Sequence, residues 1–186
     1  MFCLFVAYYS LTCILMQDLF NNLLEQLNKD HYFEETKKLF EVYESISKSM
    51  RKMDEYFSCP IFIAILLNLF GLFCAGYWLA LHPKLSLEYF LYMLGPVIYY
   101  LSHHFLLMIT ASMTNEKGDE AKSILQCLLK HFHPEIRRKI KYEKNMALKS
   151  NLTLWKMYVF DRPLIVTTLG CLLTYGILLA NLGPEY

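Results

Sequence analysis

Charged side chains are scarce in this chain of 186 residues, and they are absent from three long stretches. Asp, Glu, Lys and Arg make up 19% of the sequence, against about 25% in typical soluble domains. None of them occurs in residues 59–81, 89–115 or 163–184. Because a membrane-spanning helix needs about 20 mostly apolar residues, these stretches exclude a single soluble domain. The formal net charge of +1 argues against a nucleic-acid partner, whose binding domain would be strongly basic.

Patterns of catalytic or metal-binding residues are also missing. The six cysteines form no C-x-x-C pair, which argues against a zinc ribbon or a thiol redox site. His103 and His104 are adjacent, so on a helix they point in different directions and do not form an i, i+4 metal pair. No G-x-S-x-G, H-E-x-x-H or phosphate-binding loop occurs. We therefore expect no enzymatic activity, no cofactor and no metal site.

What the sequence does contain is apolar segments of membrane-spanning character. We expect about four spans, at residues 2–16, 59–81, 87–113 and 163–183. The first is short, but a helical pattern continues beyond it at Phe20, Leu23, Leu24 and Leu27. It resembles the inner part of a membrane helix whose outer part is missing. The predicted fold class is all-α, a polytopic membrane helical bundle with long cytoplasmic helical extensions.

The positions of Lys and Arg predict the orientation of these spans. Six lie in residues 17–58 and eleven in residues 114–162, whereas residues 82–86 hold only Lys84. Because cytoplasmic loops carry the excess of basic residues, we expect the two long segments to be cytoplasmic and the C-terminus to be extracellular. The first residues of the chain face outward in the same scheme. Four spans alternate consistently with this arrangement.

The two cytoplasmic segments show apolar positions at helical spacing. One stripe consists of Leu39, Tyr43, Ile46, Met50, Met53 and Phe57, at intervals of three and four residues. It runs directly into the second span, so we expect a long helix that projects from the membrane. A second stripe consists of Ile124, Leu125, Leu128, Leu129 and Phe132. Two interpretations remain open, an ordinary amphipathic helix packed on its neighbours or a platform that binds other subunits.

These elements divide the chain into four segments. Residues 1–58 hold a truncated transmembrane helix and a cytoplasmic helix, and residues 59–113 hold two transmembrane helices with a short outer turn. Residues 114–162 form a cytoplasmic helical anchor segment. Residues 163–186 hold the last transmembrane helix and a short outer tail.

Two spans carry polar residues on one face. In the last span, small and polar residues share a face with two larger apolar ones, namely Thr167, Gly170, Thr174, Ile177, Leu178 and Asn181. Such a face serves either close helix packing or the lining of a water-filled pore, and periodicity alone favours packing. In the third span, Tyr92, Tyr99 and His103 share a face, which is either a ligand pocket or, more commonly, a buried helix interface.

The last span also resembles a known family. Thr174 and Tyr175 are followed by five residues, 176–180, and then by Asn181 and Leu182. This is similar to the signature of arthropod gustatory receptors, in which Thr-Tyr is followed by five apolar residues and Gln-Phe. Here Asn181 stands for Gln and Leu182 for Phe. These receptors belong to the insect-type seven-transmembrane chemosensory superfamily, and their order of spans and extracellular C-terminus match the topology above.

The resemblance implies a function and a place in the cell. It implies a plasma-membrane subunit of a tetrameric ligand-gated cation channel that detects taste stimuli, present here as the family's fourth (partial) to seventh spans. The last span would line the pore, and the cytoplasmic segments would form the anchor. Tyr92, Tyr99 and His103 would be the sixth span's share of a ligand pocket.

The same resemblance implies partners and leaves one rival function. The partners would be membrane lipid, related receptor subunits in a homo- or heterotetramer, and a small-molecule tastant if the missing spans are supplied. Without those spans we expect no ligand-evoked current. The alternative function is a four-span structural or accessory membrane protein with neither pore nor ligand.

Overall fold

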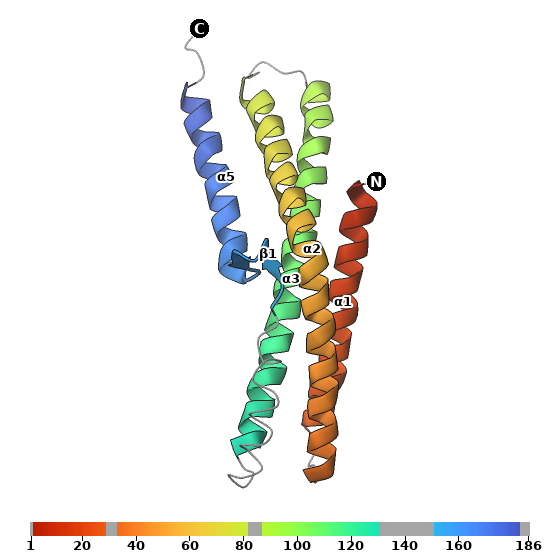
Figure 1. Ribbon diagram of the computed structural model, residues 1–186. Helices are drawn as coiled ribbons and strands as arrows, with labels where there is room; N and C mark the ends of the chain where they lie inside the picture. Colours follow the sequence, from red (N-terminus) through yellow and green to blue (C-terminus); the bar gives the residue numbers. More distant parts are fainter. Residues whose placement is uncertain (1, 29–32, 82–86, 131–150, 183–186) are drawn as a thin grey trace.

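The structure is a computed structural model, and it describes residues 2–28, 33–81, 87–130 and 151–182. These residues form an elongated helical bundle with one small β-ribbon (Figure 1). The elements, in chain order, are α1 (Phe2–Leu27), α2 (Phe33–Leu81), α3 (Leu87–Lys130), β1 (Thr153–Leu154), β2 (Tyr158–Val159) and α5 (Arg162–Leu182). The all-α fold class predicted from the sequence is confirmed.

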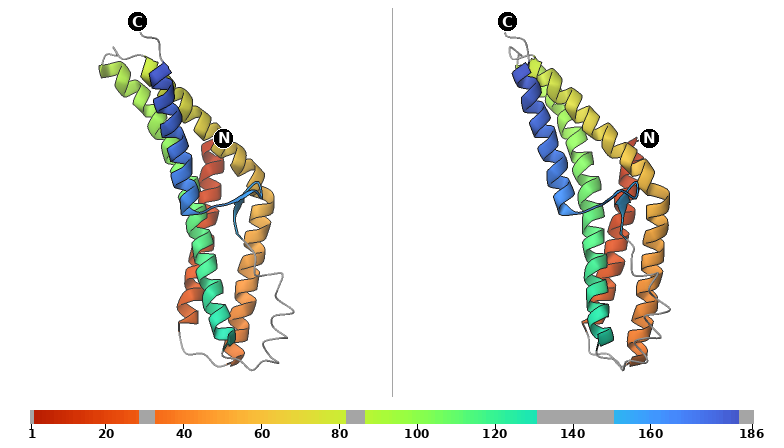
Figure 2. Two further views of the ribbon diagram at one scale, coloured as in Figure 1. Left: turned by 90° about the vertical axis from the view of Figure 1, so that its left-hand side faces the viewer. Right: turned by 60° about the vertical axis from the view of Figure 1, so that its left-hand side comes forward.

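Helices α2 and α3 are much longer than a membrane is thick. They contain 49 and 44 residues, or about 74 and 66 Å at 1.5 Å per residue. A bilayer's hydrocarbon core is only about 30 Å thick, so both helices extend well beyond a span. This confirms the expectation of long helical extensions. Helix α2 runs without interruption through Pro60, and Figure 2 shows it changing direction near the ribbon, as a helix does at an internal proline.

Three of the described helices, α1, α2 and α3, are long and apolar enough to cross a membrane, and α5 contributes a shorter apolar stretch at Arg162–Leu178. Helix α5 lies beside the C-terminal part of α2 and the N-terminal part of α3 (Figures 1 and 2). Its C-terminal end is at the same end of the bundle as the end of α2 and the start of α3. Helix α1 packs along the other part of α2 and α3.

Where α1 packs against α2 and α3, the core is formed by the apolar stripes that the sequence predicted. In α2 the residues Leu39, Tyr43, Ile46, Met50 and Met53 are buried, and Phe57 packs against them. Residues Phe20, Leu23, Leu24 and Leu27 of α1 are buried against the same core. In α3 Leu125 is buried, with Ile124 and Leu128 partly buried beside it. The helical interpretation of both stripes is therefore confirmed, except at Leu129, whose side chain lies outside the described part, and at Phe132.

Hydrogen bonds connect α1 to α3 beside this apolar core. The Gln17 side chain donates to the Thr110 carbonyl oxygen at 2.8 Å and to the Thr114 hydroxyl at 3.1 Å. The Thr114 hydroxyl lies 3.2 Å from the Cys13 carbonyl oxygen. The Phe20 ring also packs on Gly118, where an added Cβ would be in ordinary van der Waals contact with the ring at 3.4 Å. These hydrogen bonds add to the apolar packing of α1 on α3.

The segment expected as a helical anchor, 114–162, is not helical throughout. Strands β1 and β2 pair antiparallel, with Thr153 opposite Val159 and Leu154 opposite Tyr158. At the turn between them Trp155 and Lys156 have positive φ angles of 46° and 57°, which is the backbone twist that a tight hairpin requires. Threonine, tyrosine and valine favour strands, so the ribbon agrees with its local sequence. The stretch His131–His133 and the basic run 137–139 lie outside the described residues.

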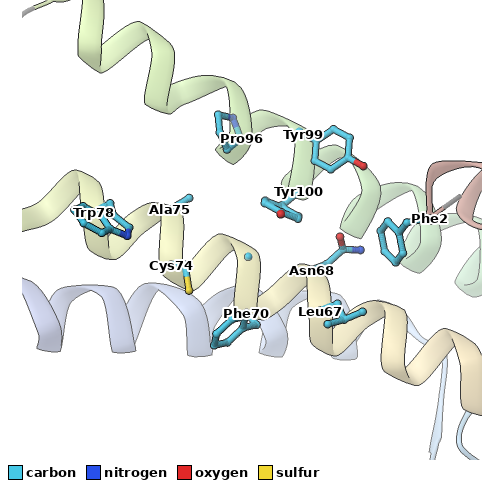
Figure 3. Close-up of a pocket in the computed structure, with 11 residues that line it drawn as sticks. Phe2, Leu67, Asn68, Phe70, Cys74, Ala75, Trp78, Pro96, Tyr99 and Tyr100 are labelled. Carbon is cyan, nitrogen blue, oxygen red and sulfur yellow. The ribbon is translucent and has the colours of Figure 1, made fainter.

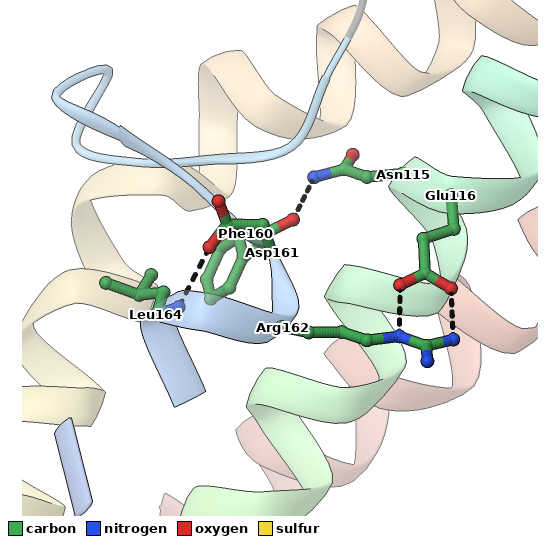
Figure 4. A network of polar contacts seen from close by, with 6 residues as sticks. All are labelled: Asn115, Glu116, Phe160, Asp161, Arg162 and Leu164. Atoms are coloured by element: carbon green, nitrogen blue, oxygen red, sulfur yellow. Dashed lines mark hydrogen bonds and ion pairs between the residues drawn. The ribbon is translucent and has the colours of Figure 1, made fainter. Parts of the chain in front are cut away.

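The ribbon belongs to a connection, residues 152–162, that we call the clasp. Its centre is the buried amide of Asn115 on α3. This amide accepts from the Leu152 N–H at 2.7 Å and donates to the carbonyl oxygens of Leu152 at 3.0 Å and Phe160 at 2.9 Å, the last of which Figure 4 shows. One α3 side chain thus binds both ends of the ribbon.

The clasp is also bound to α2. The Asp54 carboxylate accepts from the Thr153 N–H at 2.5 Å and from the Thr153 hydroxyl at 2.8 Å. Burial raises the pKa of Asp54, and the Thr153 hydrogen bonds and the charge of Lys156 partly offset that rise. The Trp155 N–H donates to the Ser58 carbonyl oxygen at 3.2 Å. The clasp therefore connects α2 to α3 at the point where α5 begins.

The first residues of α5 complete this junction (Figure 4). The Asp161 carboxylate accepts from the Leu164 N–H at 2.9 Å, which is the usual N-terminal cap of a helix. The Arg162 guanidinium makes two bonds to the Glu116 carboxylate, at 2.6 and 2.8 Å. These bonds lower the pKa of Glu116. Pro163 lies in the first turn of α5, where a proline is tolerated.

We expect the Asn115→Leu substitution to open the clasp. It removes every hydrogen bond that the amide makes and leaves buried backbone groups of residues 152 and 160 unpaired, which costs about 1–3 kcal/mol per group. Hydrogen exchange of the Leu152 amide in detergent micelles should become at least about tenfold faster, since about 1.4 kcal/mol corresponds to a factor of ten. Exchange in α1 should not change. As a matched control, Asn22→Leu at an exposed position should leave residue 152 protected, and equal protection in the Asn115 variant would contradict this account.

The Glu116–Arg162 pair predicts a definite pH dependence. Because the folded pKa of Glu116 is lowered, the pair stabilises the fold above the unfolded value of about 4.3, and this contribution is lost as pH falls through the folded pKa. In the Arg162→Gln variant, carboxyl NMR titration should show the Glu116 pKa moved upward toward its ordinary value. The control Arg51→Gln should leave it unchanged. An unshifted Glu116 in the Arg162 variant would show that the pair does not exist in solution.

Candidate functional site

Helix α5 has two opposite faces with different surroundings. Ile165, Thr168, Leu169 and Leu172 are half-buried toward the bundle. Thr167, Gly170, Thr174, Ile177 and Leu178 are all exposed, with exposed fractions of 62% and 52% for the last two. At about 100° per residue the two sets lie about 180° apart around the helix axis. The face that the sequence singled out therefore points directly away from α2 and α3.

The threonines on the outward face orient their hydroxyl groups in a specific way. The Thr167 hydroxyl donates to the Pro163 carbonyl oxygen at 2.9 Å, and the Thr174 hydroxyl donates to the Gly170 carbonyl oxygen at 2.8 Å. A hydroxyl group has one proton and two acceptor lone pairs. Because the proton is used within the helix, the free capacity on this face is oxygen acceptors, the groups that replace a cation's hydration shell.

One residue of the predicted face and one further residue of the family signature lie past the described side chains. Asn181 and Leu182 form the last turn of α5, and their side chains lie outside the described part. Tyr175, next to Thr174 in the signature, is exposed. Of the six pore-lining candidates, the structure thus brings five onto one exposed face.

Beyond the Arg162–Glu116 pair at its base, the inward face of α5 meets α3 through a polar contact among apolar ones. His104 is fully buried, and its Nε2 lies 3.2 Å from the Thr168 hydroxyl oxygen. Beside this contact is an apolar cavity of about 360 Å³ between α5 and the α2–α3 pair. Gly176 lines it together with Leu172 and Phe105. Gly176 therefore faces a gap rather than a closely packed helix.

The predicted ligand-pocket residues of α3 are only partly brought together. The rings of Tyr99 and His103 lie 4.3 Å apart, and the His103 Nδ1 lies 2.8 Å from the Tyr99 carbonyl oxygen. The Tyr99 hydroxyl and the Cys3 sulfur of α1 are 2.8 Å apart. Tyr92 is 74% exposed and touches neither of them in the described contacts. Tyr99 lines the cavity between α2 and α3, and His103 and Tyr92 are not part of its wall.

That cavity lies between α2 and α3, next to the start of α1, and has a volume of about 590 Å³ (Figure 3). A volume of this size is within the usual range of small-molecule pockets, about 300–1,000 Å³. Its wall is mostly apolar and aromatic, formed by Phe2, Leu67, Asn68, Phe70, Gly71, Cys74, Ala75, Trp78, Pro96, Tyr99 and Tyr100.

Reasoning on the sequence missed most of these residues. It looked for site residues on the third and last spans, whereas most of the cavity wall belongs to α2. A signal for one was available, since Asn68 is an amide within a stretch of 23 residues that carries no charge, 59–81. The Tyr100 ring approaches α2 at Gly71, where an added Cβ would lie 2.7 Å from the ring. Within the described ranges no three His, Cys, Asp or Glu side chains lie together as a metal site would require.

Comparison with known proteins identifies the family. No curated protein matches the chain. A family model described as 7tm Chemosensory receptor matches residues 1–181, which is nearly the whole chain. This agrees with a mainly helical bundle that has several apolar spans, and it confirms the resemblance derived from the Thr174–Leu182 signature. The chain is a multi-pass membrane protein and belongs to the 7tm chemosensory receptor family.

Proposed function

We propose that this chain acts as a subunit of a ligand-gated cation channel that detects chemical stimuli in taste, and that it has no enzymatic activity. The family assignment supports a chemosensory receptor role. The single observation that carries the channel proposal is the outward face of α5. Its two threonines, its glycine and its pair of large apolar residues point away from the bundle.

The composition of this face suits water better than lipid. A lipid-facing helix gains nothing from hydroxyl oxygens whose acceptor capacity is unused. In a pore the same oxygens contact permeating cations, and Ile177 and Leu178 form an apolar constriction one to two turns farther along that gates by dewetting. The predicted position of Asn181 extends the polar face toward the outer end.

A single α5 does not enclose a pore, so the proposal includes oligomers. We propose a homo- or heterotetramer with related receptor subunits, embedded in membrane lipid of the plasma membrane. The extensions of α2 and α3 would provide the anchor between subunits. In this arrangement residues 17–58 and 114–162 are cytoplasmic and the C-terminus is extracellular. The excess of Lys and Arg in those two segments supports this orientation.

The proposal also assigns a route from ligand to pore. The cavity between α2 and α3 would take a small-molecule tastant. Both helices are bonded to the clasp through Asp54 and Asn115, and the clasp continues directly into α5. A change in the spacing of α2 and α3 would therefore move the base of the pore helix.

We expect cysteine accessibility to distinguish the two faces of α5. In a Cys171→Ala background, co-expressed with a full-length receptor of the family, the Thr174→Cys variant should react with a cationic methanethiosulfonate reagent. Current should fall by half or more because a bulky charge then occupies the pore. The matched control, Leu172→Cys on the inward face, should show no change.

Either of two results would count against the channel. Current that is unaffected in the Thr174→Cys variant would favour the rival function, a four-span structural or accessory membrane protein. Equal inhibition at positions 172 and 174 would show that the reagent acts without regard to the face. Surface labelling of both variants confirms that each reaches the plasma membrane.

A further inference from the structure

One side chain of the α2–α3 cavity has no explanation within the fold. Asn68 is fully buried, and neither its amide nitrogen nor its amide oxygen has a hydrogen-bond partner among the residues that the structure describes. It lies in the apolar part of α2, and Figure 3 shows the amide between α2 and α3, near Phe2 and Tyr100. Burying an amide without partners is costly, and buried polar groups in folded proteins are normally satisfied. An amide left unpaired beside a cavity is an amide to which a ligand can bond.

The rest of the cavity wall limits what that ligand can be. None of the residues that line it is Asp, Glu, Lys, Arg or His. A charged ligand would therefore be buried without a counter-charge, which is strongly unfavourable. The wall instead includes the aromatic rings of Phe70, Trp78 and Tyr100, which lie at separate places around the cavity. Such a wall favours an aromatic or similarly flat apolar body.

Gly71 allows α2 and the Tyr100 ring of α3 to approach each other closely at this site. Any side chain at position 71 would collide with the Tyr100 ring, because a Cβ there would lie 2.7 Å from it. The glycine lets the ring lie directly against α2, one turn from Asn68. The ring and the amide therefore meet the same part of the cavity.

We propose that this cavity binds an uncharged, flat apolar molecule that carries a hydrogen-bond donor and an acceptor side by side, as a carboxamide or lactam does. The two atoms of the Asn68 amide would pair with that group, and the aromatic wall would hold the apolar body. This inference rests on the proposed function in naming the class of stimulus for the receptor. Asn68 would be its specificity-determining residue.

Binding can be measured without a current. The chain contains two tryptophans, of which Trp78 lines the cavity, so the Trp155→Phe variant leaves Trp78 as the one tryptophan of the chain, whose emission is followed. Three probes of similar size are titrated into the protein in lipid nanodiscs: benzamide, acetophenone and benzoate. Benzamide offers both a donor and an acceptor, acetophenone an acceptor only, and benzoate a charge. The expected order of affinity is benzamide first, at least about tenfold above acetophenone, with benzoate weakest.

Substitutions in the cavity wall then test the role of Asn68 in binding. In the Asn68→Leu variant, which is close in shape, the preference for benzamide over acetophenone should disappear. Gly71→Ala should weaken both neutral probes together, because it displaces the Tyr100 ring. The control Asn22→Leu, the same substitution on the surface of α1, should change nothing.

Two outcomes would overturn the inference. One is equal or weaker binding of benzamide relative to acetophenone by the unsubstituted cavity, a comparison that does not depend on whether any Asn68 variant folds. The other is a preference for benzamide that survives Asn68→Leu. Failure of the channel proposal is distinguishable, because it would appear as unaltered currents in the α5 accessibility experiment and would leave these binding titrations unaffected.

Discussion

The buried amide of Asn115 is the interaction on which the arrangement of the last helix depends. Helix α5 follows a short ribbon that has little core of its own, and an isolated two-stranded ribbon is marginally stable in water. Asn115 supplies three hydrogen bonds to backbone groups at both ends of that ribbon. Together with Asp54 on α2 and the Glu116–Arg162 pair, Asn115 attaches this connection firmly to α2, α3 and α5.

Once α5 is attached at its base, its orientation about its own axis has functional consequences. In the described part of α5 the inward side is mostly apolar, with a polar contact between His104 and Thr168, and it leaves a cavity beside Gly176. The outward side presents threonine oxygens. A helix that is firmly held at one end and loosely packed along its length is suited to small movements. The α2–α3 cavity lies in the two helices that the clasp joins, so one attachment serves both the candidate ligand site and the candidate pore.

The parts of this structure that were predicted are those encoded by local periodicity. The stripe from Leu39 to Met53 and the start of α5 at Pro163 depend on residues within one or two turns, so spacing alone reveals them. The ribbon was missed because its stability comes from Asn115, which is 37 residues from Leu152 in the chain. Tyr92 and Tyr99 share a helix face as predicted. A shared face does not tell whether a neighbouring helix lies beside each of these positions along α3. Asn68 was overlooked for the same reason, since only the packed structure shows that its amide lacks a partner.

The central claim is that the Thr167–Thr174 face of α5 meets water inside an assembled channel. The most direct test is the accessibility of nitroxide spin labels placed one at a time along residues 164–178 in lipid bilayers. This account predicts that labels at 167, 170 and 174 are relaxed by a water-soluble paramagnetic reagent, with the period of a helix, and that those at 165, 169 and 172 are not. Preferential relaxation of positions 167, 170 and 174 by membrane-dissolved oxygen, or protection from both reagents, would contradict it.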